Sequence, residues 1–394
     1  VSNAVNISGT TDQVTAALVT PASLVVASSA TVALDDNPSI AELNAIAAKT
    51  DGVVTATLAA NSLSNLGALD TASTDVITVT VNDDAGDNLN AEDLSALGGK
   101  TAATVTVSNA VNIQGTTDQV TAALVTDETK VTASTATVQL DDGETPSITQ
   151  LNNIAAAAGV VTASLAANSL SNLGALTTAS TDQITITVND DAATNVNAED
   201  LSALGGKTAA TVTVSNAVNI QGTTDQVTAA LVTDETKVTA STATVQLDDG
   251  ETPSITQLNN IAAAAGVVTA SLAANSLSNL GALTTASTDQ ITITVNDDAG
   301  DTLNATDLST LGGKTAATAT VSNAVVISGT QAQVTAALVT NETKVTAANA
   351  LVTVSDNAGV NLNAEDLSAI GGATGGTVTV TNAVNIQGLS LIHI

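Results

Sequence analysis

The sequence contains no Phe, Trp, Tyr, Cys or Met, and its seven basic residues are all Lys. Aromatic side chains bury the most area per residue, so their absence argues against one thick globular core. The absence of Cys excludes disulfides, thiolate metal sites and Cys nucleophiles. The apolar residues, 44% of the chain, are therefore all Ala, Val, Leu and Ile, which suit thin and repeated layers.

Positive charge is also scarce, since 38 acidic residues against 7 basic ones give a formal net charge of −31. Nucleic-acid binding needs a basic stripe, and anionic membrane surfaces repel such a chain. No apolar run approaches the roughly 20 residues that cross a bilayer. We therefore expect no nucleic-acid partner and no membrane insertion. Disordered acidic chains are poor in Val, Ile and Leu, whereas this chain is rich in them, so we expect it to fold.

A long internal repeat organises the chain. The phrase VSNAVNI begins at Val1, Val107 and Val214 and returns as VSNAVVI at Val321, and residues 107–192 are identical to residues 214–299. Such self-similarity is the signature of a repeat architecture. The predicted divisions are full repeats of four coils at 1–106, 107–213 and 214–320, a shortened repeat of two coils at 321–379, and the start of a fifth repeat at 380–388.

Both ends of the sequence indicate a piece of a longer protein. The chain starts in mid-repeat at Val1, so we expect any secretion signal or anchor to lie elsewhere. The final residues 389–394, LSLIHI, depart from the repeat and look like a translated adapter from sequencing-library preparation. We treat them as non-native, and the only histidine, His393, is set aside with them.

Within one long repeat, apolar and small polar residues alternate in four segments, which predicts half-buried strands. A stretch with helical spacing of apolar residues follows each segment. The strand-like segments are Thr104–Val107, Thr135–Leu140, Val160–Leu165 and Ile184–Val188, and the helical stretches are Val120/Ala123/Leu124, Ile148/Leu151/Ile154, Leu170/Leu173/Leu176 and Leu201/Leu204. We predict an α/β solenoid with one parallel strand and one short helix in each coil of about 27 residues, the alternative being an all-β parallel solenoid.

Start signals support these helices. Thr116–Gln119 and Ser147–Gln150 fit the capping box, and Asn197 precedes two acidic residues that suit the positive end of a helix dipole. In the last block the next copy starts at Val380, only 59 residues after Val321, so two coils are missing there. Such a loss is tolerable when coils contact only their neighbours, which makes neighbouring repeats of the chain the first expected partners.

Paired hydroxyl residues recur on the predicted strands, with apolar neighbours that must face inward. Stacked coils would turn them into a ladder of threonines, resembling the arrays of ice-binding proteins. The alternative is that Thr, the best polar strand former, simply fills a solvated face. The candidate ligand face consists of Thr104, Thr106, Thr135, Thr137, Thr162, Ser164, Thr185 and Thr187.

Acidic clusters follow several strands and are candidates for calcium, which takes six to eight oxygen ligands. The spacing of an EF-hand and the nonapeptide of calcium β-rolls are both absent, and Asp is also an ordinary turn residue. The candidate ligands are Asp83, Asp84, Asp87, Asp190 and Asp191. Because these carboxylates recur in the repeats with no His, Arg, Tyr or Cys to assist them, we expect no enzymatic activity.

The phrases TVTVSNAVNI, LNAEDLSALGGKT and ITQLNNIAAAAGVVTASL resemble repeats in giant secreted surface proteins of marine bacteria, including cyanobacteria. The resemblance covers residues 1–388. It implies an extracellular or cell-surface stalk, adhesin or envelope-layer protein. Two functions therefore stay open: a structural spacer, and a binding module that contacts ice, glycan, calcium or another cell-surface ligand.

Overall fold

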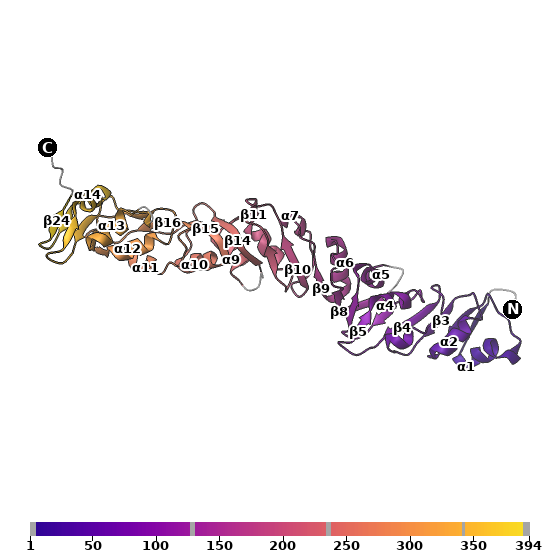
Figure 1. Ribbon diagram of the computed structural model, residues 1–394. Helices are drawn as coiled ribbons and strands as arrows, with labels where there is room; N and C mark the ends of the chain where they lie inside the picture. Colours follow the sequence, from indigo (N-terminus) through magenta and orange to yellow (C-terminus); the bar gives the residue numbers. More distant parts are fainter. Residues whose placement is uncertain (1–4, 127–130, 234–237, 341–342, 389–394) are drawn as a thin grey trace. The chain divides into compact units, whose positions relative to one another are not determined.

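A computed structural model describes residues 5–126, 131–233, 238–340 and 343–388, so the adapter-like end at 389–394 lies outside the described residues. Figure 1 labels the elements along the chain. By internal contacts the chain divides into two units. The first comprises Val1–Thr187 with Leu204–Val212, and the second comprises Val188–Ala203 with Thr213–Ile394.

In the first unit, strands and short helices alternate along the chain. Its strands are β1 (Asn6–Gly9), β2 (Thr31–Leu34), β3 (Val54–Thr57), β4 (Val76–Val81), β5 (Asn88–Asn90), β6 (Val105–Val107), β7 (Asn112–Gly115), β8 (Val131–Leu140), β9 (Ala158–Ser164) and most of β10 (Gln183–Val188). Its helices are α1 (Thr11–Val14), α2 (Ile40–Ala47), α3 (Leu63–Leu66), α4 (Ala91–Gly98), α5 (Thr117–Leu124), α6 (Ile148–Ala157) and α7 (Leu170–Leu173), with a π-helical turn η1 (Thr15–Val19) and a 3-10 turn η2 (Pro21–Ser23).

The second unit continues the same alternation. Its strands are β11 (Asn195–Asn197), β13 (Asn219–Gly222), β14 (Val238–Leu247), β15 (Ala265–Ser271), β16 (Gln290–Val295), β17 (Thr302–Asn304), β18 (Ala319–Val321), β19 (Val326–Gly329), β20 (Val345–Thr346), β21 (Leu351–Val354), β22 (Asn361–Asn363), β23 (Val378–Val380) and β24 (Asn385–Gln387). Its helices are α9 (Thr224–Leu231), α10 (Ile255–Ala264), α11 (Leu277–Leu280), α12 (Ala305–Gly312), α13 (Gln331–Leu338) and α14 (Ala364–Ala373). Helix α8 (Ala198–Gly205) and strand β12 (Val212–Val214) have residues in both units.

All strand pairings with a described register are parallel. In the first unit β1, β2, β3 and β4 pair in succession, and β5, β7, β8, β9 and β10 form a second succession. Paired residues lie from 21 to 26 positions apart, as in Ala56↔Ile77 and Val79↔Val105. Parallel strands separated by crossovers with a helix form an α/β solenoid-like stack, with no closed barrel among the described residues, which confirms the predicted fold class.

The core of each coil is a thin layer of aliphatic side chains. In α2, Leu43 and Ile46 lie on one face and are fully buried, while Val32 and Val54 on the adjacent strands point toward the same layer. Each fully buried Leu or Ile stabilises the fold by about 1.5–3 kcal/mol relative to exposure. Because the helix and the strands each contribute a single row of side chains to this layer, small aliphatic residues fill it without aromatic rings.

The predicted helix starts are confirmed. The side chains of Thr116 and Ser147 each accept a hydrogen bond from the main-chain N–H three residues later. The Oε1 atoms of Gln119 and Gln150 accept in turn from the main-chain N–H groups of Thr116 and Ser147, which completes two capping boxes. Asn197 Oδ1 accepts from the Glu199 N–H at 2.7 Å. One helix was predicted too long, because α7 ends at Leu173 and Gly174 follows it.

Some coils contain a second strand segment that the sequence pattern did not predict. After β6 the chain turns at Ser108, whose Oγ donates to the Val81 carbonyl at 3.0 Å, and then enters β7. The Asn109 side chain donates to the Asp83 carbonyl at 2.7 Å and fixes the same corner to the preceding coil. Strand β11 is a second example, and in β8 the two segments merge into one strand with a register shift between Ala133 and Thr137.

The shortened repeat keeps the stack continuous. Strand β21 pairs with β19 on one side, Val326 lying against Leu351, and with β23 on the other, Val352 lying against Val378. Along the described part of this repeat, α14 is the next α-helix after α13, and no counterpart of the α6 and α7 coils lies between them. A stack held by contacts between neighbouring coils accommodates this loss.

Candidate functional site

The candidate threonine face points outward, as predicted. Val105 and Val107 are buried, and Thr104 and Thr106 between them are exposed. The same alternation holds on β8, β9 and β10, where Thr135, Thr137, Thr162, Ser164 and Thr185 are exposed and Thr187 is half-buried. These hydroxyls therefore lie on the solvent side of the strands.

The strand register, however, does not stack these threonines into a continuous ladder, and that prediction is wrong. Thr106 lies between Thr80 and Thr132, but Thr137 lies between Asn112 and Val160. Thr162 lies between Gln139 and Gln183 in the same way. The coils differ in length, so rows of one residue type last for about three strands and are then interrupted.

Asparagine and glutamine side chains link neighbouring strands on this face. Asn112 Nδ2 donates to Asn88 Oδ1 at 2.8 Å, and Thr137 Oγ1 donates to Asn112 Oδ1 at 3.2 Å. Asn219 and Asn195 repeat the first contact at 2.8 Å in the second unit. Part of the polar face is thus occupied in holding adjacent coils together.

The acidic residues after the strands have a second structural role. In several coils a carboxylate accepts a hydrogen bond from the first main-chain N–H of the helix in the preceding coil. This contact satisfies an N–H that has no partner inside the helix and places negative charge at the positive end of the helix dipole. The pairs are Thr11–Asp36 (2.9 Å), Leu63–Asp83 (2.7 Å), Thr117–Glu144 (2.8 Å), Thr224–Glu251 (2.8 Å), Leu277–Asp297 (2.7 Å) and Gln331–Asp356 (2.6 Å).

These inter-coil caps affect ionisation. The main-chain N–H of Thr117 holds the pKa of the Glu144 carboxyl below its usual value, and Thr224 does the same to the pKa of Glu251. The side-chain hydroxyl of Thr11 lowers the pKa of Asp36. In each case a hydrogen bond to the charged form is the main cause, so the ionised carboxylate is the form that joins the coils.

The calcium candidates are not gathered into one group. Asp83 caps α3, Asp87 Oδ2 accepts from the Asp84 N–H at 3.1 Å, and Asp190 and Asp191 occupy the corresponding turn of the next repeat. Across the described ranges, no three Asp, Glu, His or Cys side chains lie close enough to hold a metal ion together. A calcium site here would have to rely on main-chain and amide oxygens.

Among the residues that the structure describes, one aspartate in each full repeat is buried. Asp75 is 3% exposed, and its carboxylate accepts hydrogen bonds from the main-chain N–H groups of Val54 at 2.7 Å and Ala72 at 2.9 Å. Asp182 and Asp289 make the same contacts in the next two repeats. These aspartates were not predicted as site residues, because a TD pair is typical of an ordinary turn.

A buried threonine completes this junction. Thr101, 1% exposed, accepts from the Ile77 N–H at 2.8 Å and donates to the Ile77 carbonyl at 2.8 Å. Thr101 precedes β6, so its hydroxyl makes the two bonds to Ile77 that a neighbouring strand would otherwise make. Thr208 and Thr315 repeat the contact. The recurrence of KTAA before each strand was the only sequence signal for this role.

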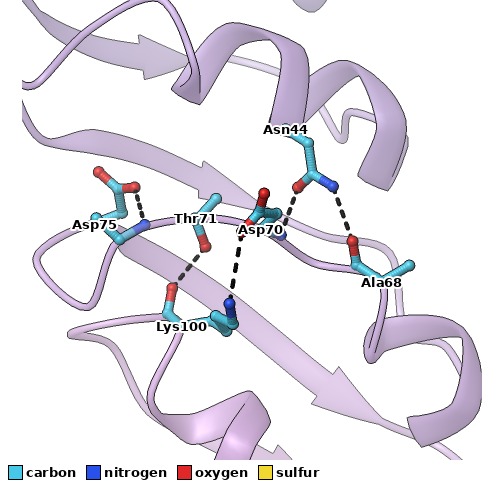
Figure 2. A network of polar contacts seen from close by, with 7 residues as sticks. Asn44, Ala68, Asp70, Thr71, Asp75 and Lys100 are labelled. Atoms are coloured by element: carbon cyan, nitrogen blue, oxygen red, sulfur yellow. Dashed lines mark hydrogen bonds and ion pairs between the residues drawn. The ribbon is translucent and has the colours of Figure 1, made fainter.

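The surface beside Asp75 carries a second network, shown in Figure 2. Asn44 donates to the Ala68 carbonyl and accepts from the Asp70 N–H, both at 2.8 Å, and so ties α2 to the following coil. Thr71 Oγ1 donates to the Lys100 carbonyl at 2.6 Å. The Lys100–Asp70 ion pair, at 3.6 Å, is solvent-exposed and adds little to stability.

Comparison with known proteins adds no assignment. No protein-family model matches the chain, and no curated protein matches its sequence. Among the helices of the described residues, none combines the length and the apolar character that crossing a bilayer requires. The recurring polar groups described above mainly connect one coil to the next.

Proposed function

We propose that this chain is a structural spacer segment of a large extracellular or cell-surface repeat protein, without catalytic activity of its own. The observation that carries the proposal is the use of the recurring polar residues. Asp75, Thr101 and the carboxylates that cap helices in the preceding coil all join coils and recur with the repeat. In such a chain the number of coils sets the reach, and any target is bound by another part of the protein.

Composition and the shortened repeat also support a spacer. A net charge of −31 keeps a repetitive protein soluble and limits self-association. The pairing of β21 with both β19 and β23 means that coil number can change while the stack persists. The resemblance to giant secreted surface proteins supports the extracellular location.

The test is a length series. Proteins carrying one, two or three copies of the 107–213 repeat would be measured by small-angle X-ray scattering. Parallel strands lie about 4.8 Å apart, so each four-coil repeat should add about 19 Å to the maximum dimension. A maximum dimension that grows only with the cube root of mass, as in a globular protein, would exclude the spacer role.

Ice binding is not the function we propose. A flat array needs hydroxyls in regular rows, whereas Asn112, Val160 and Gln139 interrupt the threonine rows. Thermal hysteresis measured on the whole chain would check this, and ice shaping at micromolar protein would restore ice binding as a candidate.

A further inference from the structure

The first and third repeats each contain a groove beside a short strand, and each groove lies within a single unit. In the first unit the cavity has a volume of about 510 Å³ and lies between the four-residue helix α3 and the pair β5–α4. In the second unit its counterpart of about 520 Å³ lies between α11 and the pair β17–α12. The groove forms where the coil of the four-residue helix α3 is followed by the coil that contains the second strand segment β5.

One edge of the strand in this groove has no strand partner. Among the described residues β5 pairs only with β7, and the Asn112 N–H donates to the Asp87 carbonyl at 2.8 Å. In a parallel pair the main-chain groups of successive residues point to opposite edges. The N–H and C=O groups of Asn88 and the N–H group of Asn90 therefore point away from β7, and both residues line the groove. The C=O group of Asn90, the N-cap of α4, accepts the first hydrogen bond of that helix and keeps one lone pair.

The second unit has the same geometry. Strand β17 pairs with β19, and the Val326 N–H donates to the Asp301 carbonyl at 2.7 Å. Both main-chain groups of Thr302 and the N–H group of Asn304, the N-cap of α12, consequently face the groove that these residues line. An open strand edge of this kind is a template for another strand.

In the shortened repeat a side-chain amide of the same chain covers the corresponding edge. There the first residue of α13 is Gln331, which is 7% exposed. Its Nε2 donates to the Asn363 carbonyl at 2.6 Å, and its Oε1 accepts from the Asn363 N–H at 3.0 Å. One amide thus satisfies both main-chain groups on the edge of β22.

Gln331 in the shortened repeat occupies the position that Leu63 occupies in the first repeat, relative to the coil that follows it. Each is the first residue of its helix, and each donates its main-chain N–H to an aspartate, Asp356 or Asp83. Asn363 follows Asp356 by seven residues, as Asn90 follows Asp83. The leucine side chain cannot hydrogen-bond, so the first and third repeats leave open an edge that a side-chain amide covers in the shortened one.

We propose that the grooves at Asn88/Asn90 and at Thr302/Asn304 bind an extended, basic peptide segment of a partner protein, which adds to the strand edge. Strand addition of this kind draws affinity from main-chain hydrogen bonds and specificity from alternate side chains. An apolar side chain of the peptide would face the buried Leu63 and Leu89. Lys100 also lines the groove but forms an ion pair with Asp70, so Asp83, Asp93 and the net charge of −31 favour lysines at the peptide ends. This docking role is independent of the spacer role.

The probe is a fluorescent form of the peptide acetyl-Lys-Asn-Leu-Asn-Lys-amide, titrated with the whole chain and followed by anisotropy. Its Leu would contact the buried Leu63 and Leu89 in the groove. Its Asn residues would extend the row that Asn88 and Asn112 form across neighbouring strands. We expect saturable binding with a dissociation constant below about 1 mM. The same peptide with N-methylated backbone amides keeps its side chains but lacks N–H donors, and should bind at least about tenfold more weakly.

Two protein variants complete the experiment. Leu63→Gln, Leu170→Gln and Leu277→Gln together place the amide of the shortened repeat in all three LSNL copies, and should weaken binding at least about tenfold. Gln331→Leu uncovers the edge of β22 and should raise the number of bound peptides by one. Thr106→Gln, an exposed change outside the groove lining, should leave binding unaltered.

The outcomes decide the proposal. Circular dichroism establishes that each variant is folded, and if the triple variant is not, the N-methyl peptide and Gln331→Leu carry the test. No saturable binding up to about 1 mM overturns the proposal. Equal binding of the N-methylated peptide, or binding that neither variant changes, overturns it as well, because the peptide would then be held elsewhere or by side chains alone.

Discussion

The carboxylate of Asp75 accepts a hydrogen bond from the main-chain N–H of Val54, 21 residues earlier in the chain, at 2.7 Å. Its other oxygen accepts from Ala72 N–H, so one buried side chain satisfies donors in two adjacent coils. A buried main-chain donor without an acceptor is costly. This junction is therefore the place where one substitution should loosen two coils together.

Asp75→Asn should lower the free energy of unfolding of this region by about 1–3 kcal/mol. Asparagine has one acceptor oxygen, so the Val54 or the Ala72 N–H would face an NH₂ group. Hydrogen exchange should show faster exchange of the Val54 amide, in a repeat whose sequence is unique. Asp84→Asn, in an exposed turn, is the matched control and should change stability by less than about 0.5 kcal/mol. Equal effects of the two changes would contradict the junction.

Thr101→Val should destabilise the same junction by about 2 kcal/mol, because valine has the shape of threonine but leaves the Ile77 N–H and C=O unpaired. Thr101→Ser keeps the hydroxyl and should have a smaller effect. The exposed Thr106→Val provides the comparison. Denaturant unfolding and exchange of the Ile77 amide would measure the difference, and a harmless Thr101→Val would show that the hydroxyl is dispensable.

The caps between coils should make stability depend on pH. The pKa values of Glu144 and Glu251 are lowered in the folded chain, so their contribution is present above the usual carboxyl pKa and is lost as pH falls through the folded value. The double variant Glu144→Gln/Glu251→Gln should melt at a lower temperature than the parent at about pH 6, and the difference should vanish near pH 3.

The comparison between parent and variant matters here because acidification also relieves repulsion within a chain of net charge −31. That effect is nearly the same in both proteins. A melting difference that stays constant from about pH 6 to pH 3 would show that ionisation of these two carboxylates does not strengthen the caps.

Ala193→Gly should stabilise the second repeat by about 0.5–1 kcal/mol. Ala193 has φ +64°, whereas the corresponding turn positions hold Gly86, Gly300 and Gly359 with φ between +83° and +92°. Alanine is strained in this left-handed region. The reverse change, Gly86→Ala, meets no atom within 4 Å, so it should destabilise through backbone strain alone. Thermal melting of both variants tests the pair, and a loss of stability in Ala193→Gly would contradict the argument.

Deleting residues 137–184 should leave a folded protein. The deletion joins Ala136 to Thr185 and reproduces the junction of Ala350 and Leu351 in the shortened repeat. Deleting 137–183 is the control, because it sets Ile184 directly after the buried Ala136 and turns every following side chain to the opposite face. Far-ultraviolet circular dichroism and cooperative melting should be retained in the first protein and lost in the second.

Much of this fold could be predicted from local patterns. Alternation over several residues identified the strands near Val105 and Ile184, and capping boxes located the starts of α5 and α6. Strands β7 and β11 were missed, because NIQG and NVN are short and largely polar, and they become strands only through pairing with neighbouring coils. Pairing of this kind has no signature within a single segment.

The site residues show the same limit. The outward direction of Thr137 followed from period two. Its neighbours depend on the register, in which the sequence offset between paired residues varies between 21 and 26. Asp83 was noticed for its charge, while its bond to Leu63 comes from a coil stacked against it. Asp75 and Thr101 look like turn residues in sequence, and only burial between coils reveals their importance.

The caps between coils also give synthesis a direction. The N-terminal amide of Thr117 in α5 is satisfied by Glu144, which leaves the ribosome 27 residues later. At typical translation rates that interval lasts about 1–5 s. Each coil with such a cap is therefore finished by the one made after it, so the nascent chain matures from its N-terminus one step behind elongation, and early capped coils gain full stability before the last are translated.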